Sequence, residues 1–169
     1  SLLSGLDGES LILGTGSGQL IRVFLGNPKN NEILVETLGA TKRNGIGVSS
    51  LAFLLGGQTL VVGDEDGGVN SYQLMREKGG FKRLLPMHRF ESHKKEVSVI
   101  QASFRNKGFI TGDSSGAIRY HYGTSGNTHF EVPLVGRKSI LAAYISPKND
   151  GLILLDSNKK LFNWKMYHP

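Results

Sequence analysis

Cysteine is absent from the 169 residues, and proline is scarce, with only 5. The absence of cysteine excludes disulfides, thiolate metal sites and a cysteine nucleophile. The chain has no run of 18 apolar residues, so the sequence predicts no membrane-spanning helix. The first five residues have neither the basic nor the apolar region of a signal peptide. Charged residues make up 20 %, below the roughly 25 % norm, which excludes a disordered polyelectrolyte.

Glycine, in contrast, is abundant, with 23 residues. This is about twice the usual fraction of ~7 %. Because proline is scarce, the glycines do not form a low-complexity linker. Glycine scattered among β-branched and aromatic residues is typical of tight turns between short strands. The net charge of +6 permits contact with phosphate, anionic lipid or an acidic partner, without indicating which.

One pattern occurs four times, at residues 11–20, 60–69, 109–118 and 152–161. Each copy has an apolar triplet, a polar turn that ends in glycine or a substitute, and an aliphatic residue. This pattern predicts a β-hairpin in which a carboxylate caps turn amides and glycine provides a positive φ. The expected caps are Asp64, Asp113 and Asp156, and the expected glycines are Gly18, Gly67 and Gly116. Three residues into the next strand, one equivalent position holds Val23, Tyr72, His121 and Trp164.

Further apolar strands precede the later hairpins, and more polar segments follow them. We expect inner strands at residues 48–53, 97–104 and 140–146, and outer strands at 81–90 and 129–134. Residues 36–43 are the nearest candidate for a helix, but Gly39 weakens it. Four strands in a unit of about 43 to 49 residues are typical of a β-propeller blade.

The third unit resembles a WD repeat from His93 to Ile118. The resemblance extends over most of the chain but is divergent, because Trp164 is followed by Lys165 and Ser92 replaces the usual glycine before His93. It therefore implies a WD-like propeller without the buried His/Ser/Asp/Trp network of the true family.

The predicted fold class is all-β, a β-propeller-like fragment of a larger protein with about four WD-like four-stranded blades. The first and last blades are expected to be incomplete. The first has only Leu2 and Leu3 before its hairpin, and the last stops after its third strand. The expected units are a partial blade at 1–40, blades at 46–91 and 95–136, and a partial blade at 138–169.

The C-terminal segment 161–169 is a blade strand that runs into His168-Pro169. Together with the divergent blades, it resembles the extra soluble domain in the long-form phosphate ABC transporter permease of Gram-negative bacteria. That resemblance implies a domain on the periplasmic side of the inner membrane. It transfers no transport residue, because those lie in membrane helices.

Three motifs suggest chemistry, and each has a simpler interpretation. Residues 112–116 match the Gly-x-Ser-x-Gly elbow of serine hydrolases, but the elbow needs a strand–turn–helix and this segment predicts strand–turn–strand. Residues 64–67 resemble a calcium loop but lack the trailing carboxylate. Residues 14–18 have the wrong glycine spacing for a dinucleotide loop. We expect hairpin turns at all three, and hence no enzyme, no metal and no cofactor.

Basic residues gather in the predicted loops. Most of these charges are expected to be only solvated, and the functional alternative is a rim that attracts lipid headgroups or phosphate. The candidate contacts with an anion or partner are Arg137, Lys138, Lys159, Lys160, Lys94 and Lys95. Nucleic acid is not expected, because its binding favours aromatic residues interleaved with the basic ones.

The sequence thus predicts a non-catalytic accessory domain of a phosphate transporter permease, acting as a scaffold or docking surface. Its partners would be other transporter subunits or a periplasmic protein, and its open sheet edges would favour self-association. The alternative is a fragment of an unrelated WD-like adaptor that mediates protein–protein interaction.

Overall fold

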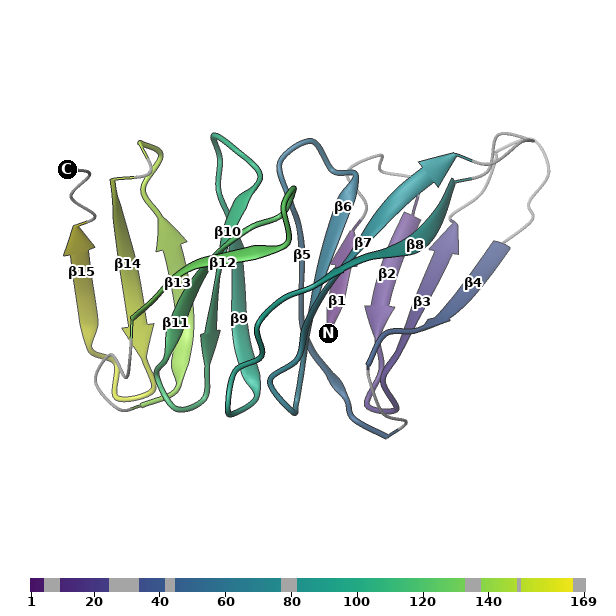
Figure 1. The fold of residues 1–169 in the computed structure, drawn as a ribbon. Coiled ribbons are helices and arrows are strands. Elements are labelled where there is room, and N and C mark those ends of the chain that lie inside the picture. The colour runs from purple at the N-terminus through teal and green to yellow at the C-terminus, as the bar shows by residue number, and fades with distance from the viewer. Residues whose placement is uncertain are drawn as a thin grey trace.

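Four antiparallel sheets stand side by side in a row (Figure 1). The computed structural model describes residues 1–4, 10–24, 34–41, 45–76, 82–132, 138–148 and 150–165. We number the sheets as blades 1 to 4 in chain order. In each blade the strands follow one another from the innermost outwards. The described residues form strands and turns and contain no helix long and apolar enough to cross a membrane.

Blade 1 consists of β1 (Leu2–Ser4), β2 (Ser10–Gly14), β3 (Gln19–Phe24) and β4 (Leu34–Gly39). Blade 2 consists of β5 (Val48–Phe53), β6 (Thr59–Asp64), β7 (Val69–Arg76) and β8 (Lys82–Arg89). Blade 3 consists of β9 (Val97–Ala102), β10 (Gly108–Asp113), β11 (Ile118–Tyr122) and β12 (Asn127–Val132). Blade 4 consists of β13 (Ile140–Ile145), β14 (Gly151–Asp156) and β15 (Leu161–Lys165).

The all-β prediction is confirmed, with two corrections. Blade 1 has four strands, because Leu2–Ser4 pairs with β2 as a short innermost strand that the sequence analysis had discounted. Residues 36–39 of the segment considered for a helix belong to strand β4, which pairs with β3 from Gln19↔Gly39 to Phe24↔Leu34, and residues 42 and 43 lie outside the described residues. The sequence of this segment does not clearly favour either a helix or a strand, and its pairing with β3 makes it a strand.

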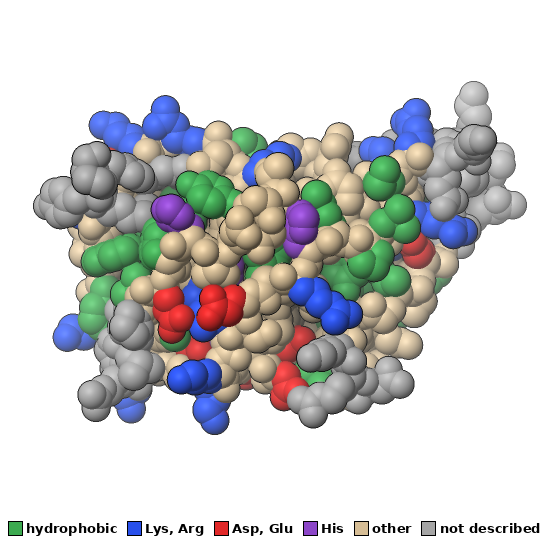
Figure 2. All heavy atoms as spheres, viewed as in Figure 1, with side chains coloured by type: hydrophobic (Ala, Val, Ile, Leu, Met, Phe, Trp, Pro, Cys, Tyr) green, Lys and Arg blue, Asp and Glu red, His purple; other side chains and the backbone are tan. Residues whose placement is uncertain are grey.

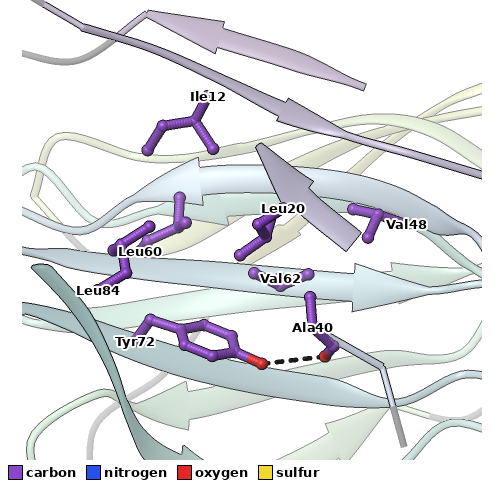
Figure 3. Packing of buried hydrophobic residues seen from close by; sticks show 8 residues of the cluster. All are labelled: Ile12, Leu20, Ala40, Val48, Leu60, Val62, Tyr72 and Leu84. Carbon is purple, nitrogen blue, oxygen red and sulfur yellow. Dashed lines mark hydrogen bonds between the residues drawn. The ribbon is translucent and has the colours of Figure 1, made fainter. Parts of the chain in front are cut away.

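The hydrophobic core lies between the blades. Ile12 and Leu20 of blade 1 pack with Leu60, Val62 and other residues of blade 2 (Figure 3). The Tyr72 hydroxyl donates a hydrogen bond of 3.0 Å to the Ala40 carbonyl at the edge of this cluster. Two further clusters lie between blades 2 and 3 and between blades 3 and 4. Successive side chains of a strand point to opposite faces of its sheet. Blades 2 and 3 therefore each pack one face on the preceding blade and the other face on the following blade.

Antiparallel order places the loops at two ends of the row. The turns after the innermost strands, at residues 54–58, 103–107 and 146–150, lie at one end, which we call the inner-turn end (top in Figure 1). The four predicted hairpin turns and the connections between blades lie at the other, which we call the capped-turn end.

Candidate functional site

The turns at the capped-turn end share one hydrogen-bond arrangement. Asp64 Oδ1 accepts from the amides of Asp66 and Gly68, at 3.0 and 2.7 Å. Asp113 and Asp156 accept the equivalent pairs of amides. In blade 1, Thr15 takes this place, and its hydroxyl accepts from the Gln19 amide at 3.0 Å. The predicted carboxylate caps are confirmed.

The glycines of these turns have the predicted positive φ. Gly18, Gly67 and Gly116 lie at 82°, 87° and 98°. In blade 4 the same position holds Lys159, with φ 62°, the one non-glycine residue with positive φ in the described ranges. The Gly112–Gly116 segment joins strand β10 to strand β11, so Ser114 lies in a hairpin turn as predicted.

Blade 3 contains a buried polar network that the sequence analysis wrongly excluded. His93 Nδ1 lies 3.2 Å from Asp113 Oδ2, and His93 Nε2 lies 2.7 Å from the Thr111 hydroxyl. The same hydroxyl lies 2.8 Å from His121 Nε2, and His121 Nδ1 lies 3.0 Å from the Thr128 hydroxyl. His93, Thr111, Asp113 and His121 are at most 5 % exposed.

Burial favours the neutral form of both histidines, and with neutral rings the direction of every proton in this network follows from Asp113. An ionised carboxylate only accepts, so His93 must carry its proton on Nδ1 and accept from the Thr111 hydroxyl at Nε2. The Thr111 oxygen then accepts from His121 Nε2, and the Thr128 hydroxyl donates to His121 Nδ1. With both rings neutral, each histidine has one donor and one acceptor satisfied.

Burial sets the acidity of these histidines. Burial, followed by the nearby His93 and Arg119, lowers the pKa of His121 to about 3. Burial also lowers the pKa of His93, although the Asp113 carboxylate opposes the shift. His121 stacks on Phe109 with ring centroids 4.8 Å apart and lies edge-on to Phe90 at 5.2 Å. Because His93, Thr111, Asp113 and His121 are buried, these hydrogen bonds join the strands of blade 3 to the connection before β9.

The network was not predicted, because the sequence has no Trp-Asp dipeptide and has Ser92 in place of the usual glycine before His93. Thr111 supplies the hydroxyl expected from serine, and His121 occupies the tryptophan position with a donor nitrogen. The network is recognisable when the hydrogen-bond donors and acceptors at its four positions are compared one position at a time. The other blades lack the set, since Leu13, Val62 and Leu154 occupy the position of Thr111.

Arg119 fastens the outer part of blade 3. Its Nε and Nη2 donate to Glu131 Oε2 at 3.1 and 2.9 Å, and Nη2 lies 3.4 Å from Glu91. Its Nη1 donates to the Ser92 carbonyl beside His93. Arg119 therefore joins strand β12 to the connection that carries the buried histidine.

The predicted basic contact residues lie at the capped-turn end and are exposed. Lys94 and Lys95 lie in the connection before β9, Lys138 lies just before β13, and Lys159 and Lys160 lie in the β14–β15 turn. The Ser157 amide donates to the Ser139 carbonyl at 2.9 Å, which brings the Lys138 segment beside that turn. Arg137 lies outside the described residues.

Acidic residues share this end. Glu65 and Asp66 lie in the β6–β7 turn, and Glu91 and Glu96 lie in the connection between blades 2 and 3. The capped-turn end is therefore mixed in charge, and the anion contact predicted there stays a prediction.

A groove of about 430 Å³ separates the end of blade 1 from the outer strands of blade 2. Asn70 and Tyr72 form part of its floor, and His88 and Arg89 of β8 form part of one wall. The floor groups already bond within the fold, since the Asn70 amide and the Tyr72 hydroxyl both donate to the Ala40 carbonyl. In the described part of the chain, no group of three metal-ligating side chains gathers here or elsewhere.

Comparison with known proteins supports the fold. No family model matches the chain, and no curated protein matches it. The crystal structure of Sqt1 from Chaetomium thermophilum is similar, with a TM-score of 0.78 and 13 % sequence identity. The match covers 98 % of this chain and 42 % of that one, so the chain spans less than half of the similar protein. The arrangement of sheets described above is thus the WD40-like β-propeller fold.

Proposed function

We propose that this chain is a non-catalytic scaffold that binds another protein through the loops at the ends of its blades. The observation that carries the proposal is the use of the polar turn residues. The Asp113 carboxylate caps a turn and holds His93. The same turn hydrogen bonds recur in each blade, whereas the loops differ in sequence from blade to blade. Scaffold proteins present binding residues in this way.

The similarity to a WD40-like propeller supports this proposal at the level of fold. A role as accessory domain of a phosphate transporter permease, on the periplasmic side of the inner membrane, stays a prediction. It depends on the resemblance of segment 161–169, and residues 166–169 lie outside the described residues. The adaptor function needs only the blades, so we favour it.

Selection of random displayed peptides on the 169-residue chain tests the proposal. We expect enriched peptides that bind saturably, and whose binding falls when charges are reversed at one loop end. The two matched variants are K94E/K95E at the capped-turn end and R105E/K148E at the inner-turn end. Peptides that bind both variants as well as the unaltered chain would show binding away from the loops and would contradict the proposal.

A further inference from the structure

The inner-turn end combines exposed apolar side chains with basic ones. Phe104 is 53 % exposed in the β9–β10 turn, and Leu55 is 43 % exposed in the β5–β6 turn. Tyr144 of β13 is 43 % exposed and lies 5.6 Å from Phe104, between ring centroids. Isolated apolar residues on a surface are ordinary, but a contiguous group on neighbouring loops marks an interaction site.

Basic side chains link the same turns. Arg105 Nη1 donates to the Lys148 carbonyl at 3.4 Å, which joins the turns of blades 3 and 4. Lys107 Nζ donates to the Leu55 carbonyl, which joins the turns of blades 2 and 3. These hydrogen bonds and the ring contact of Phe104 with Tyr144 bring three cations and three apolar side chains together at this end. We call them the inner-turn patch: Leu55, Phe104, Arg105, Lys107, Tyr144 and Lys148.

In the described turns, acidic residues are fewer at the inner-turn end than at the capped-turn end. Of the acidic residues in the described ranges, Asp150 alone lies in a turn at the inner-turn end. The others lie on strands β4 and β12 or at the capped-turn end. Figure 2 shows basic side chains along both the upper and the lower edge of this face, and most of the visible acidic side chains in the lower half. Asp150 accepts a hydrogen bond of 2.5 Å from Ser146 Oγ.

We propose that the inner-turn patch binds an acidic peptide segment in which an aromatic or aliphatic side chain lies between Asp or Glu residues. The carboxylates would meet Arg105, Lys107 and Lys148, and the apolar side chain would cover Phe104 and Tyr144. Aromatic residues and arginine are the residue types that contribute most to protein interfaces. This proposal rests on the scaffold function above and names the partner's chemistry.

A protein partner fits the patch better than a membrane does. Anionic lipid is typically recognised by clusters of about 4 to 8 basic residues, whereas the patch has three. Two of these cations are fixed by hydrogen bonds to carbonyls of neighbouring turns, which suits carboxylates at defined positions. The aromatic pair provides a defined apolar contact between them.

Fluorescence anisotropy with a labelled synthetic peptide of Glu, Phe and Leu tests the proposal. We expect saturable binding that weakens as salt is added, because the patch is exposed. R105E/K148E should lower the affinity about tenfold, equivalent to about 1.4 kcal/mol. F104A should lower it less, by about threefold. The matched control K94E/K95E, at the opposite end, should change it less than twofold.

Folding is checked by thermal unfolding of each variant, which should match the unaltered chain because the altered side chains are on the surface. Equal binding of a peptide with Lys in place of Glu would overturn the proposal. The proposal would also be overturned if the chain bound phosphatidylserine vesicles but not the acidic peptide, and if R105E/K148E abolished this vesicle binding. Selected peptides that depend only on Lys94 and Lys95 would also overturn it, while leaving the scaffold function standing.

Discussion

At the scale of single residues, the buried pair of histidines makes stability depend on pH. The folded chain keeps His93 and His121 neutral, with the pKa of His121 lowered to about 3, whereas an unfolded histidine titrates near 6.5. Between those values the unfolded chain binds protons that the folded chain does not. The free energy of unfolding therefore falls as pH falls below about 6.5, and is unaffected by these groups above it.

We expect this loss to be at most about 1.4 kcal/mol per pH unit for each histidine. Urea unfolding at pH 7 and pH 5 measures it. His121→Gln, which keeps a donor and an acceptor but does not titrate, should be less stable at pH 7 and less sensitive to pH. The control His129→Gln, at an exposed position, should keep the sensitivity of the unaltered chain. Identical pH dependence in both variants would mean that the buried network is not responsible.

Lys159 is a second residue with a specific energetic role. It adopts φ 62° where the other three hairpin turns have glycine, and its Cβ is disfavoured in that conformation by roughly 1 to 2 kcal/mol. Lys159→Gly should raise the free energy of unfolding by about 1 kcal/mol, since glycine's greater entropy in the unfolded chain offsets part of the gain. Lys160→Gly, at an ordinary φ, should not stabilise. A destabilised Lys159→Gly chain would contradict the assigned turn geometry.

At the scale of elements, close approach between blades depends on small residues at the ends of second strands. A Cβ built on Gly63 would lie 2.6 Å from Val97 Cγ1, where β9 of the next blade begins. A Cβ built on Gly112 would lie 3.2 Å from Ile140 Cβ, where β13 of the next blade begins. Blade 4 has Leu155 at this position and no neighbouring sheet on that side in the described residues.

Gly63→Ala is therefore expected to lower the free energy of unfolding by about 1 to 3 kcal/mol, as overpacking does in tight cores. Gly16→Ala is a matched control, because its Cβ would meet nothing within 4 Å. That change should stay within about 0.5 kcal/mol. Chemical unfolding of the two variants makes the comparison, and equal effects would argue against the packing between blades 2 and 3.

How far the sequence predicts the structure differs among these elements. The hairpins were predictable, because Asp64, Asp113 and Asp156 with their following polar turns specify local geometry. Strand β1 was not, since three residues carry too little pattern and their structure depends on pairing with β2. The inner-turn patch was also not predictable, because Leu55, Phe104 and Tyr144 come from different blades and meet only in the folded chain.

At the scale of the whole molecule, two sheet faces remain uncovered in the described part of the chain. Leu2 and Val35 of blade 1 are 64 % and 55 % exposed, and Ile153 and Leu161 of blade 4 are 44 % and 66 % exposed. These faces belong to opposite ends of the row, so one could pack on the other in a second copy. We expect I153K/L161K to reduce self-association of the isolated chain in light scattering. Unchanged particle mass would place the contact elsewhere.

The central claim is that this region binds a protein through its loops. Cross-linking of lysines in the protein purified from its source, followed by mass spectrometry, tests the claim most directly. We predict links from a partner protein to loop lysines, above all Lys107 and Lys148 at the inner-turn end. Partner links confined to lysines on the strands, such as Lys82 of β8, or an absence of any partner link to this region, would contradict it.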